Sequence, residues 1–164
     1  MKRMLPLLLL LLPFLAFGQK VKFSHTGKVN KASREDLQLL AEEFIHSYFT
    51  TLKESQLEKS DGSLIIRKAL QKLNVEINGI ERPVLFGYDL IISLQEGRYS
   101  AEVTNTTFTY TTQPVPGERF LGPTPPDDKK DDVEYLSTMS SYQQQTRAFI
   151  DYLFKEIDKA LKVK

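Results

Sequence analysis

The sequence predicts a two-layer α+β sandwich, in which two amphipathic helices cover one face of an antiparallel sheet. Three observations lead to this prediction: a long hairpin of alternating apolar residues between Pro83 and Tyr110, a helical apolar stripe before it, and a second one after it. The 164 residues include no cysteine, which excludes a disulfide framework and a thiolate metal site. A chain of this length suffices for one domain with a sizeable core.

Residues 1–18 have the pattern of a signal peptide. Residues 2–3 are Lys-Arg, residues 5–15 form an apolar run, and residues 16–18, Ala-Phe-Gly, have the small-x-small form of a cleavage site. The run is too short to span a bilayer comfortably, although a permanent N-terminal anchor is the alternative. We expect cleavage after Gly18 and a single exported domain over residues 19–164, periplasmic or secreted, without stable membrane insertion.

A short strand and a helix are predicted before residue 55. Val21 and Phe23 alternate in a strand expected around Val21 to Thr26. Ser33 is a good N-cap, and acidic residues in the following turn suit the helix dipole. The apolar stripe predicts a helix that continues to about Glu54. It comprises Leu37, Leu40, Ala41, Phe44, Tyr48 and Leu52.

Two interpretations remain open for residues 63–78. Apolar residues recur first at even-numbered and later at odd-numbered positions. This pattern favours a long strand with an irregularity near Lys68 to Gln71. A short helix over residues 64–73 is the alternative. Asn78-Gly79 is the strongest turn dipeptide in the chain, so the central hairpin follows directly.

The central hairpin has a predicted register. A two-residue loop at Glu96-Gly97 places apolar residues opposite one another on one face, and an extra residue near Asn105 to Thr107 keeps the match beyond that point. The expected pairs are Leu94 with Tyr99, Ile92 with Ala101, Leu90 with Val103, Phe86 with Phe108 and Val84 with Tyr110.

A Pro/Asp-rich loop is predicted at residues 113–132. Five prolines precede the run Asp-Asp-Lys-Lys-Asp-Asp, and Phe120-Leu121 is the one apolar exception. We expect this loop to be dispensable for folding, because it has little apolar surface to bury. An amphipathic helix is then predicted from about Ser137 to Lys162.

The second face of the hairpin is the candidate binding face, which we expect to be exposed to water. It carries Leu85, Asp89, Ile91, Ser93, Arg98, Ser100 and Glu102. Without the two basic residues of the leader, the chain has 20 Lys and Arg against 21 Asp and Glu. This near-neutral balance lacks the basic footprint of a nucleic-acid binder.

The hairpin from Gly87 to Tyr99, followed by Thr104 to Tyr110, resembles a family of secreted bacterial domains of unknown function described as having a TBP-like fold. In that family an aliphatic strand ends in an acidic-Gly-Arg/Lys-Tyr turn, and the next strand closes on an aromatic pair. The likeness covers roughly Phe23 to Leu161, although Phe44 to Phe49 stands where the family often has a tryptophan. The resemblance implies a TBP-like fold and supplies no catalytic residues. TBP binds DNA through a sheet face with a basic rim, but this face has at least as many acids as bases, so we predict no nucleic-acid partner.

The chemistry-bearing residues form no recognisable catalytic or metal motif. His25 and His46 lie on separate elements and are interpreted as structural. Asp127, Asp128, Asp131 and Asp132 could attract calcium, but lysines interrupt the run and no calcium-loop pattern is present. We therefore predict no cofactor.

Two functional hypotheses follow from these observations. The first is a non-catalytic binding module of the periplasm or envelope, with a protein or an envelope component as its partner. The second is a hydrolase that uses the carboxylates of Asp89 and Glu102, acting on an envelope substrate.

Overall fold

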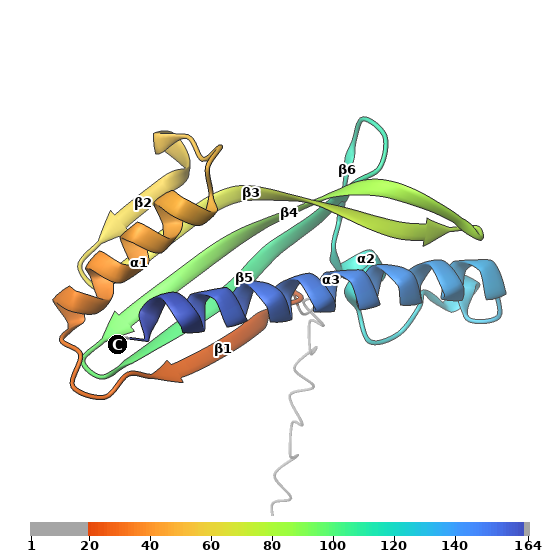
Figure 1. Cartoon of the computed structure of the whole chain (residues 1–164). Coiled ribbons are helices and arrows are strands. Elements are labelled where there is room, and N and C mark those ends of the chain that lie inside the picture. The colour runs from red at the N-terminus through yellow and green to blue at the C-terminus, as the bar shows by residue number, and fades with distance from the viewer. Residues whose placement is uncertain (1–19, 163–164) are drawn as a thin grey trace, which may run out of the picture.

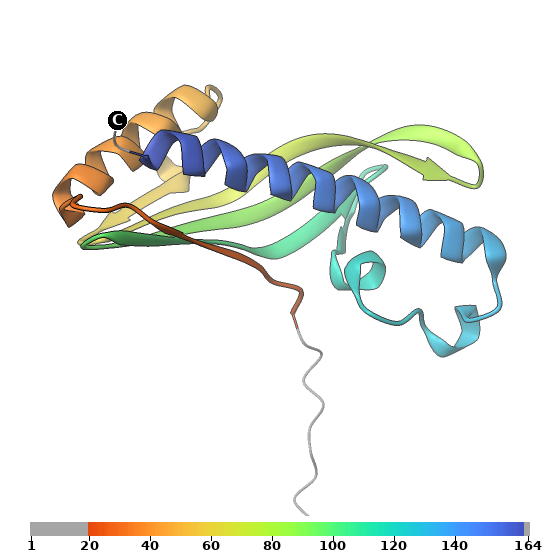
Figure 2. The same ribbon diagram turned by 60° about the horizontal axis from the view of Figure 1, so that its bottom comes forward.

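The computed structural model describes residues 20–162, so the predicted signal peptide lies outside the described residues. Within this range six strands form one antiparallel sheet in the order β1-β5-β4-β3-β2, with β6 paired to β5. Both long helices lie on the same side of the sheet (Figures 1 and 2), which confirms the predicted two-layer α+β architecture. Between residues 20 and 162, no helix combines the length and the apolar character needed to cross a membrane.

The elements follow one another in chain order with short connections. They are β1 (Phe23–Lys28), α1 (Arg34–Tyr48), η1 (Glu54–Gln56), β2 (Leu57–Ser60), β3 (Ser63–Ile77), β4 (Ile80–Gln95), β5 (Arg98–Thr109), β6 (Pro114–Pro116), α2 (Glu118–Leu121), η2 (Asp127–Lys129) and α3 (Val133–Leu161).

The core lies between the sheet and the two long helices. In β4 the even-numbered residues from Val84 to Leu94 are buried, as the alternation predicts. Each of the two long helices contributes one stripe of apolar side chains to this core. The fully buried side chains of this layer include Leu37, Ile45, Phe86, Tyr88, Leu90, Ile92, Phe108, Ile150, Leu153 and Ile157.

The hairpin register confirms four of the five predicted pairs, from Leu94 with Tyr99 to Phe86 with Phe108. The predicted bulge is also present, since the register shifts around Asn105. The fifth pair does not form, because β5 ends at Thr109 and Tyr110 is 48% exposed. Residues 63–77 are the long strand, with a register shift between Ile66 and Ala69, and the helix alternative is wrong.

Two boundaries near the N-terminus differ from the prediction. β1 begins and ends two residues later than expected. Helix α1 ends at Tyr48 instead of Glu54, because the backbone turns at Phe49 to return along the sheet as the unpredicted β2. The threonines that follow Phe49 have low helix propensity, whereas Phe49 and Leu52 still pack on the core and so extend the apolar pattern.

The Pro/Asp-rich segment contains β6, α2 and η2, so it is more ordered than a bare loop. The Phe120 ring stacks on Tyr142 with centroids 4.2 Å apart, and it meets Phe108 edge-on. The last helix starts at Val133, four residues before the predicted start, because Asp132 caps it by accepting from the backbone N–H of Tyr135.

The outer edge of β3 has two different neighbours. β2 pairs only with Ser63 to Ile66. Further along, α3 lies beside the edge, where Ser141 Oγ accepts from the backbone N–H of Glu76 at 2.8 Å and Thr138 Oγ1 from that of Asn78 at 3.4 Å.

Candidate functional site

The open face is the sheet surface opposite α1 and α3. The structure places all seven predicted face residues on it, because the odd-numbered residues of β4 and the even-numbered residues at the start of β5 point away from the helices. Ile91 lies opposite Glu102, and Ser93 lies opposite Ser100. Leu85, at the other end, is 43% exposed.

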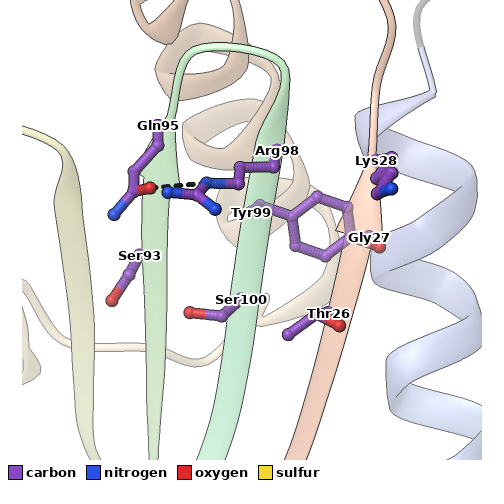
Figure 3. A pocket seen from close by; sticks show the side chains of 8 residues that line it. All are labelled: Thr26, Gly27, Lys28, Ser93, Gln95, Arg98, Tyr99 and Ser100. Carbon is purple, nitrogen blue, oxygen red and sulfur yellow. Dashed lines mark hydrogen bonds between the residues drawn. The ribbon is translucent and has the colours of Figure 1, made fainter.

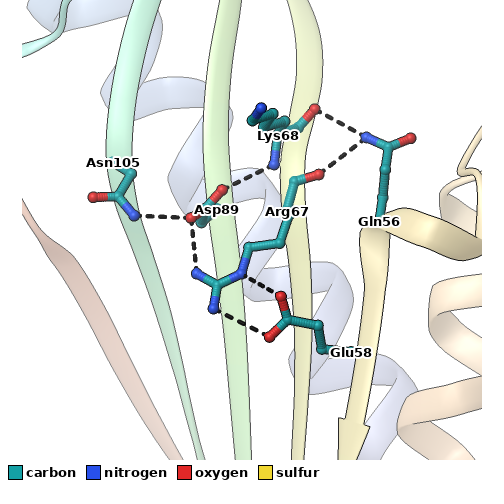
Figure 4. Close-up of polar contacts among 6 residues, drawn as sticks. All are labelled: Gln56, Glu58, Arg67, Lys68, Asp89 and Asn105. Carbon is teal, nitrogen blue, oxygen red and sulfur yellow. Dashed lines mark hydrogen bonds and ion pairs between the residues drawn. The ribbon is translucent and has the colours of Figure 1, made fainter.

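Asp89 does not face water as expected, because its carboxylate is enclosed by a polar cluster. Oδ1 accepts from the backbone N–H of Lys68 at 2.8 Å, while Oδ2 accepts from Asn105 Nδ2 at 2.8 Å and Arg67 Nη1 at 3.1 Å (Figure 4). Lys68 and Asn105 have φ values of 53° and 50°, in the left-handed region that non-glycine residues rarely adopt. Asp89 therefore fixes a bulge on each of its two neighbouring strands.

Arg67 extends this cluster toward the edge of the sheet. Its Nε and Nη2 atoms donate to the two carboxylate oxygens of Glu58, at 2.9 and 3.1 Å. The side-chain amide of Gln56 donates to the carbonyls of Arg67 and Lys68, at 3.0 and 3.2 Å (Figure 4). The cluster thereby ties η1 and β2 to β3.

The two carboxylates of the hydrolase hypothesis are both engaged. Burial alone would raise the pKa of Asp89, but the hydrogen bonds from Asn105, Lys68 and Arg67 outweigh it and lower the pKa below its ordinary 3.8. A general acid at neutral pH needs the opposite shift. Glu102 pairs with Lys22 Nζ at 2.6 Å.

A hollow of about 430 Å³ lies where β1, β5 and β4 meet on the open face (Figure 3). Of the predicted residues it includes Ser93, Arg98 and Ser100. Sequence reasoning missed the contribution of β1, because it placed that strand without assigning its neighbour; the alternation of Ser24, Thr26 and Lys28 was the available pattern. The lining residues are Thr26, Gly27, Lys28, Ser93, Gln95, Arg98, Tyr99 and Ser100.

A second group of polar contacts, which the sequence did not predict, lies on the helix side of β1 and β5. Asp158 of α3 accepts from the Tyr99 hydroxyl and lies 3.0 Å from His25 Nε2, while the His25 ring stacks on Phe154. Burial alone would raise the pKa of Asp158, but the contacts with Tyr99 and His25 lower it on balance. These contacts join β1, β5 and α3, which gives His25 a structural role. His46 is exposed in the last turn of α1.

Residues 20–162 contain no group of three or more His, Asp or Glu side chains placed to hold a metal ion. Two carboxylates of the aspartate run contact lysines instead. Asp132 pairs with Lys129 at 3.1 Å, and Asp127 pairs with Lys130 at 2.7 Å.

Two solved structures share this arrangement of helices and sheet. One is a TBP-like protein from Parabacteroides distasonis, with a TM-score of 0.66 and 13% identity over 87% of this chain and 92% of that chain. The fold is TBP-like. A DUF4468 family protein from Bacteroides ovatus also shares it, with a TM-score of 0.65 and 14% identity over 88% of each chain.

These neighbours are consistent with the predicted resemblance to domains of unknown function with a TBP-like fold. At such low identity the likeness establishes the TBP-like fold and assigns no role to any residue. Neither a protein-family model nor a curated protein matches the sequence.

Proposed function

We propose that this protein is an exported, non-catalytic binding module that recognises a protein or another component of the envelope through the open face. The observation that carries the proposal is that α1 and α3 cover only one face of the sheet, while the other face presents exposed apolar side chains. Leu70 is 67% exposed and Leu85 is 43% exposed, and both lie on this face. A contiguous exposed apolar patch with a polar rim is typical of an interaction surface, and Leu70 and Leu85 are diagonal neighbours across β3 and β4.

The charged groups of the open face support binding over hydrolysis. Asp89 maintains the bulges of β3 and β5, and Glu102 is held by Lys22. The pKa of Asp89 is lowered, the opposite of the shift that a catalytic acid needs at neutral pH. The export part of the proposal rests on the basic start, apolar run and cleavage site of residues 1–18.

Site-specific photo-crosslinking in cells tests which face meets the partner. A benzoyl-phenylalanine at Leu70 probes the open face, and one at Leu39 serves as the matched control. Leu39 is 69% exposed, almost the same as Leu70, but lies on α1. We expect crosslinked adducts in the envelope fraction from the Leu70 variant and not from the Leu39 variant.

Circular dichroism of both variants checks that they fold before the adducts are compared. Adducts from Leu39 alone, or equal adducts from both positions, would show that the open face is not the recognition surface.

A further inference from the structure

We propose that the hollow at the β1–β5–β4 end of the open face binds a compact oxyanion, a carboxylate or a phosphate group of a small ligand. This inference rests on the proposed binding function, because it names the chemistry that one part of the open face recognises.

Two positive side chains border the hollow, and in Figure 3 the Arg98 guanidinium extends toward Gln95, away from Lys28. Lys28 of β1 is directly opposite Arg98 of β5, and both are exposed. In the part of the chain that the structure describes, neither side chain takes part in an ion pair. A negative ligand in the hollow would be attracted by both charges.

The Arg98 side chain is already held in place. Its Nε donates to Gln95 Oε1 at 2.6 Å, which fixes the plane of the guanidinium group. In Figure 3 this group lies on the same side of the sheet as the hydroxyls of Ser93 and Ser100. The terminal amino groups of Arg98 remain to donate, and a planar guanidinium is well suited to carboxylate and phosphate oxygens.

Hydroxyl groups supply further donors next to these charges. Thr26 is opposite Ser100, and Ser100 is opposite Ser93, so three hydroxyls from three strands lie in one row across the hollow. The row continues beyond the hollow through Ser63 and Ser60. Each hydroxyl can donate one hydrogen bond to an anionic oxygen.

Negative charge is absent from the lining of the hollow. Glu102 is one position further along the same face of β5, but Lys22 holds it at 2.6 Å. Asp158 lies on the helix side, where it binds Tyr99 and His25. Lys28 and Arg98 would repel a cationic ligand, so the charge pattern favours an anion.

Titration of the ¹⁵N-labelled mature protein tests the proposal, with inorganic phosphate and glucuronate as anionic probes. Glucose is the neutral control, and sodium chloride is the control for ionic strength. We expect saturable amide shifts confined to residues 26–28 and 93–100 with at least one anion, and none with either control. Binding of phosphate alone would identify a phosphate group as the ligand chemistry, and stronger binding of glucuronate would identify a carboxylate on a hydroxylated carrier.

Two variants separate this site from general surface charge. Arg98→Gln should weaken the anion affinity about tenfold or more, because it removes a charged hydrogen-bond donor. Arg147→Gln, at an exposed position of α3, should leave the affinity unchanged. Lys28→Gln should weaken binding, because it removes one of the two positive charges that border the hollow.

Three results would overturn the oxyanion site: shifts that do not saturate, shifts that appear equally with sodium chloride, or an anion affinity that is unchanged in Arg98→Gln. The proposed function would still be tested independently, because crosslinking at Leu70 does not depend on Arg98. Adducts at Leu70 together with no anion binding would refute this inference alone.

Discussion

Replacing Asp89 with alanine tests whether its carboxylate holds the two bulged strands together. The change removes three hydrogen bonds, from Lys68 N–H, Asn105 Nδ2 and Arg67 Nη1. Hydrogen bonds to a charged group contribute about 1.5–3 kcal/mol each when buried, which sets the upper limit. Water can replace part of this, because the Arg67 side chain is 39% exposed and Lys68 and Asn105 are exposed. We expect Asp89→Ala to lower the free energy of unfolding by about 2–4 kcal/mol.

Urea unfolding followed by far-UV circular dichroism measures this loss, since the chain has no tryptophan to report it by fluorescence. For a domain of this size each kcal/mol corresponds to roughly 2–4 °C in Tm. Glu102→Gln is the matched control on the same face, because its partner Lys22 is 49% exposed and such pairs contribute at most about 1 kcal/mol. The reasoning is refuted if Asp89→Ala unfolds at the wild-type urea concentration, or if Glu102→Gln costs as much.

The lowered pKa of Asp89 also determines the sign of the pH dependence. Because the folded-state pKa lies below the ordinary value of 3.8, the contribution of this carboxylate is fully present above that value. It is lost as the pH falls through the folded-state pKa. The stability difference between wild type and Asp89→Asn should therefore be largest at neutral pH and shrink in acid. A difference that grew on acidification would contradict the stabilising role of the ionised Asp89 carboxylate.

Gly27→Ala places a Cβ 2.2 Å from Cε1 of the Tyr99 ring, which Asp158 holds in place, so we expect a loss of about 1–3 kcal/mol in urea unfolding. Phe120→Ala should cost about 2 kcal/mol, because the half-buried ring stacks on Tyr142; wild-type stability would contradict this contribution to the packing. N-terminal sequencing of the envelope-fraction protein should begin at Gln19, and an intact leader there would contradict export with cleavage. Fluorescence anisotropy at low salt should detect no binding to a DNA duplex, and salt-sensitive sub-micromolar binding would mean that the charges of the open face have been misjudged.

The register of the central hairpin was predictable from the sequence because the side-chain period of a strand is two. A slip of one residue would bury Ser93 and expose Ile92, so the apolar pattern permits one register on each side of the bulge. The same argument correctly favoured the long strand β3, including the irregularity near Lys68. Local patterns were sufficient for these elements because each has one apolar face.

The end of α1 and the surroundings of Asp89 were not predictable in this way. Leu52 keeps the helical spacing but reaches the core from a turn, so periodicity overestimates the helix. Alternation places Asp89 on the outer face, yet its burial depends on Arg67, which arrives from the neighbouring strand. Similarly, Lys28 is paired in register with Arg98 only because β1 pairs with β5, and these strands are distant in the sequence.

The hydroxyls of α3 beside the outer edge of β3 have a consequence for the behaviour of the protein in a crowded compartment. A long strand with a free edge offers a row of backbone groups on which another chain can add a strand, the route to aggregates and fibrils. Ser141 and Thr138 occupy two of these backbone N–H groups from a helix, and a helix cannot itself be extended by a further strand. The β3–β4 hairpin thus extends beyond β2, and α3 protects the edge of β3 against intermolecular strand pairing near the hairpin turn.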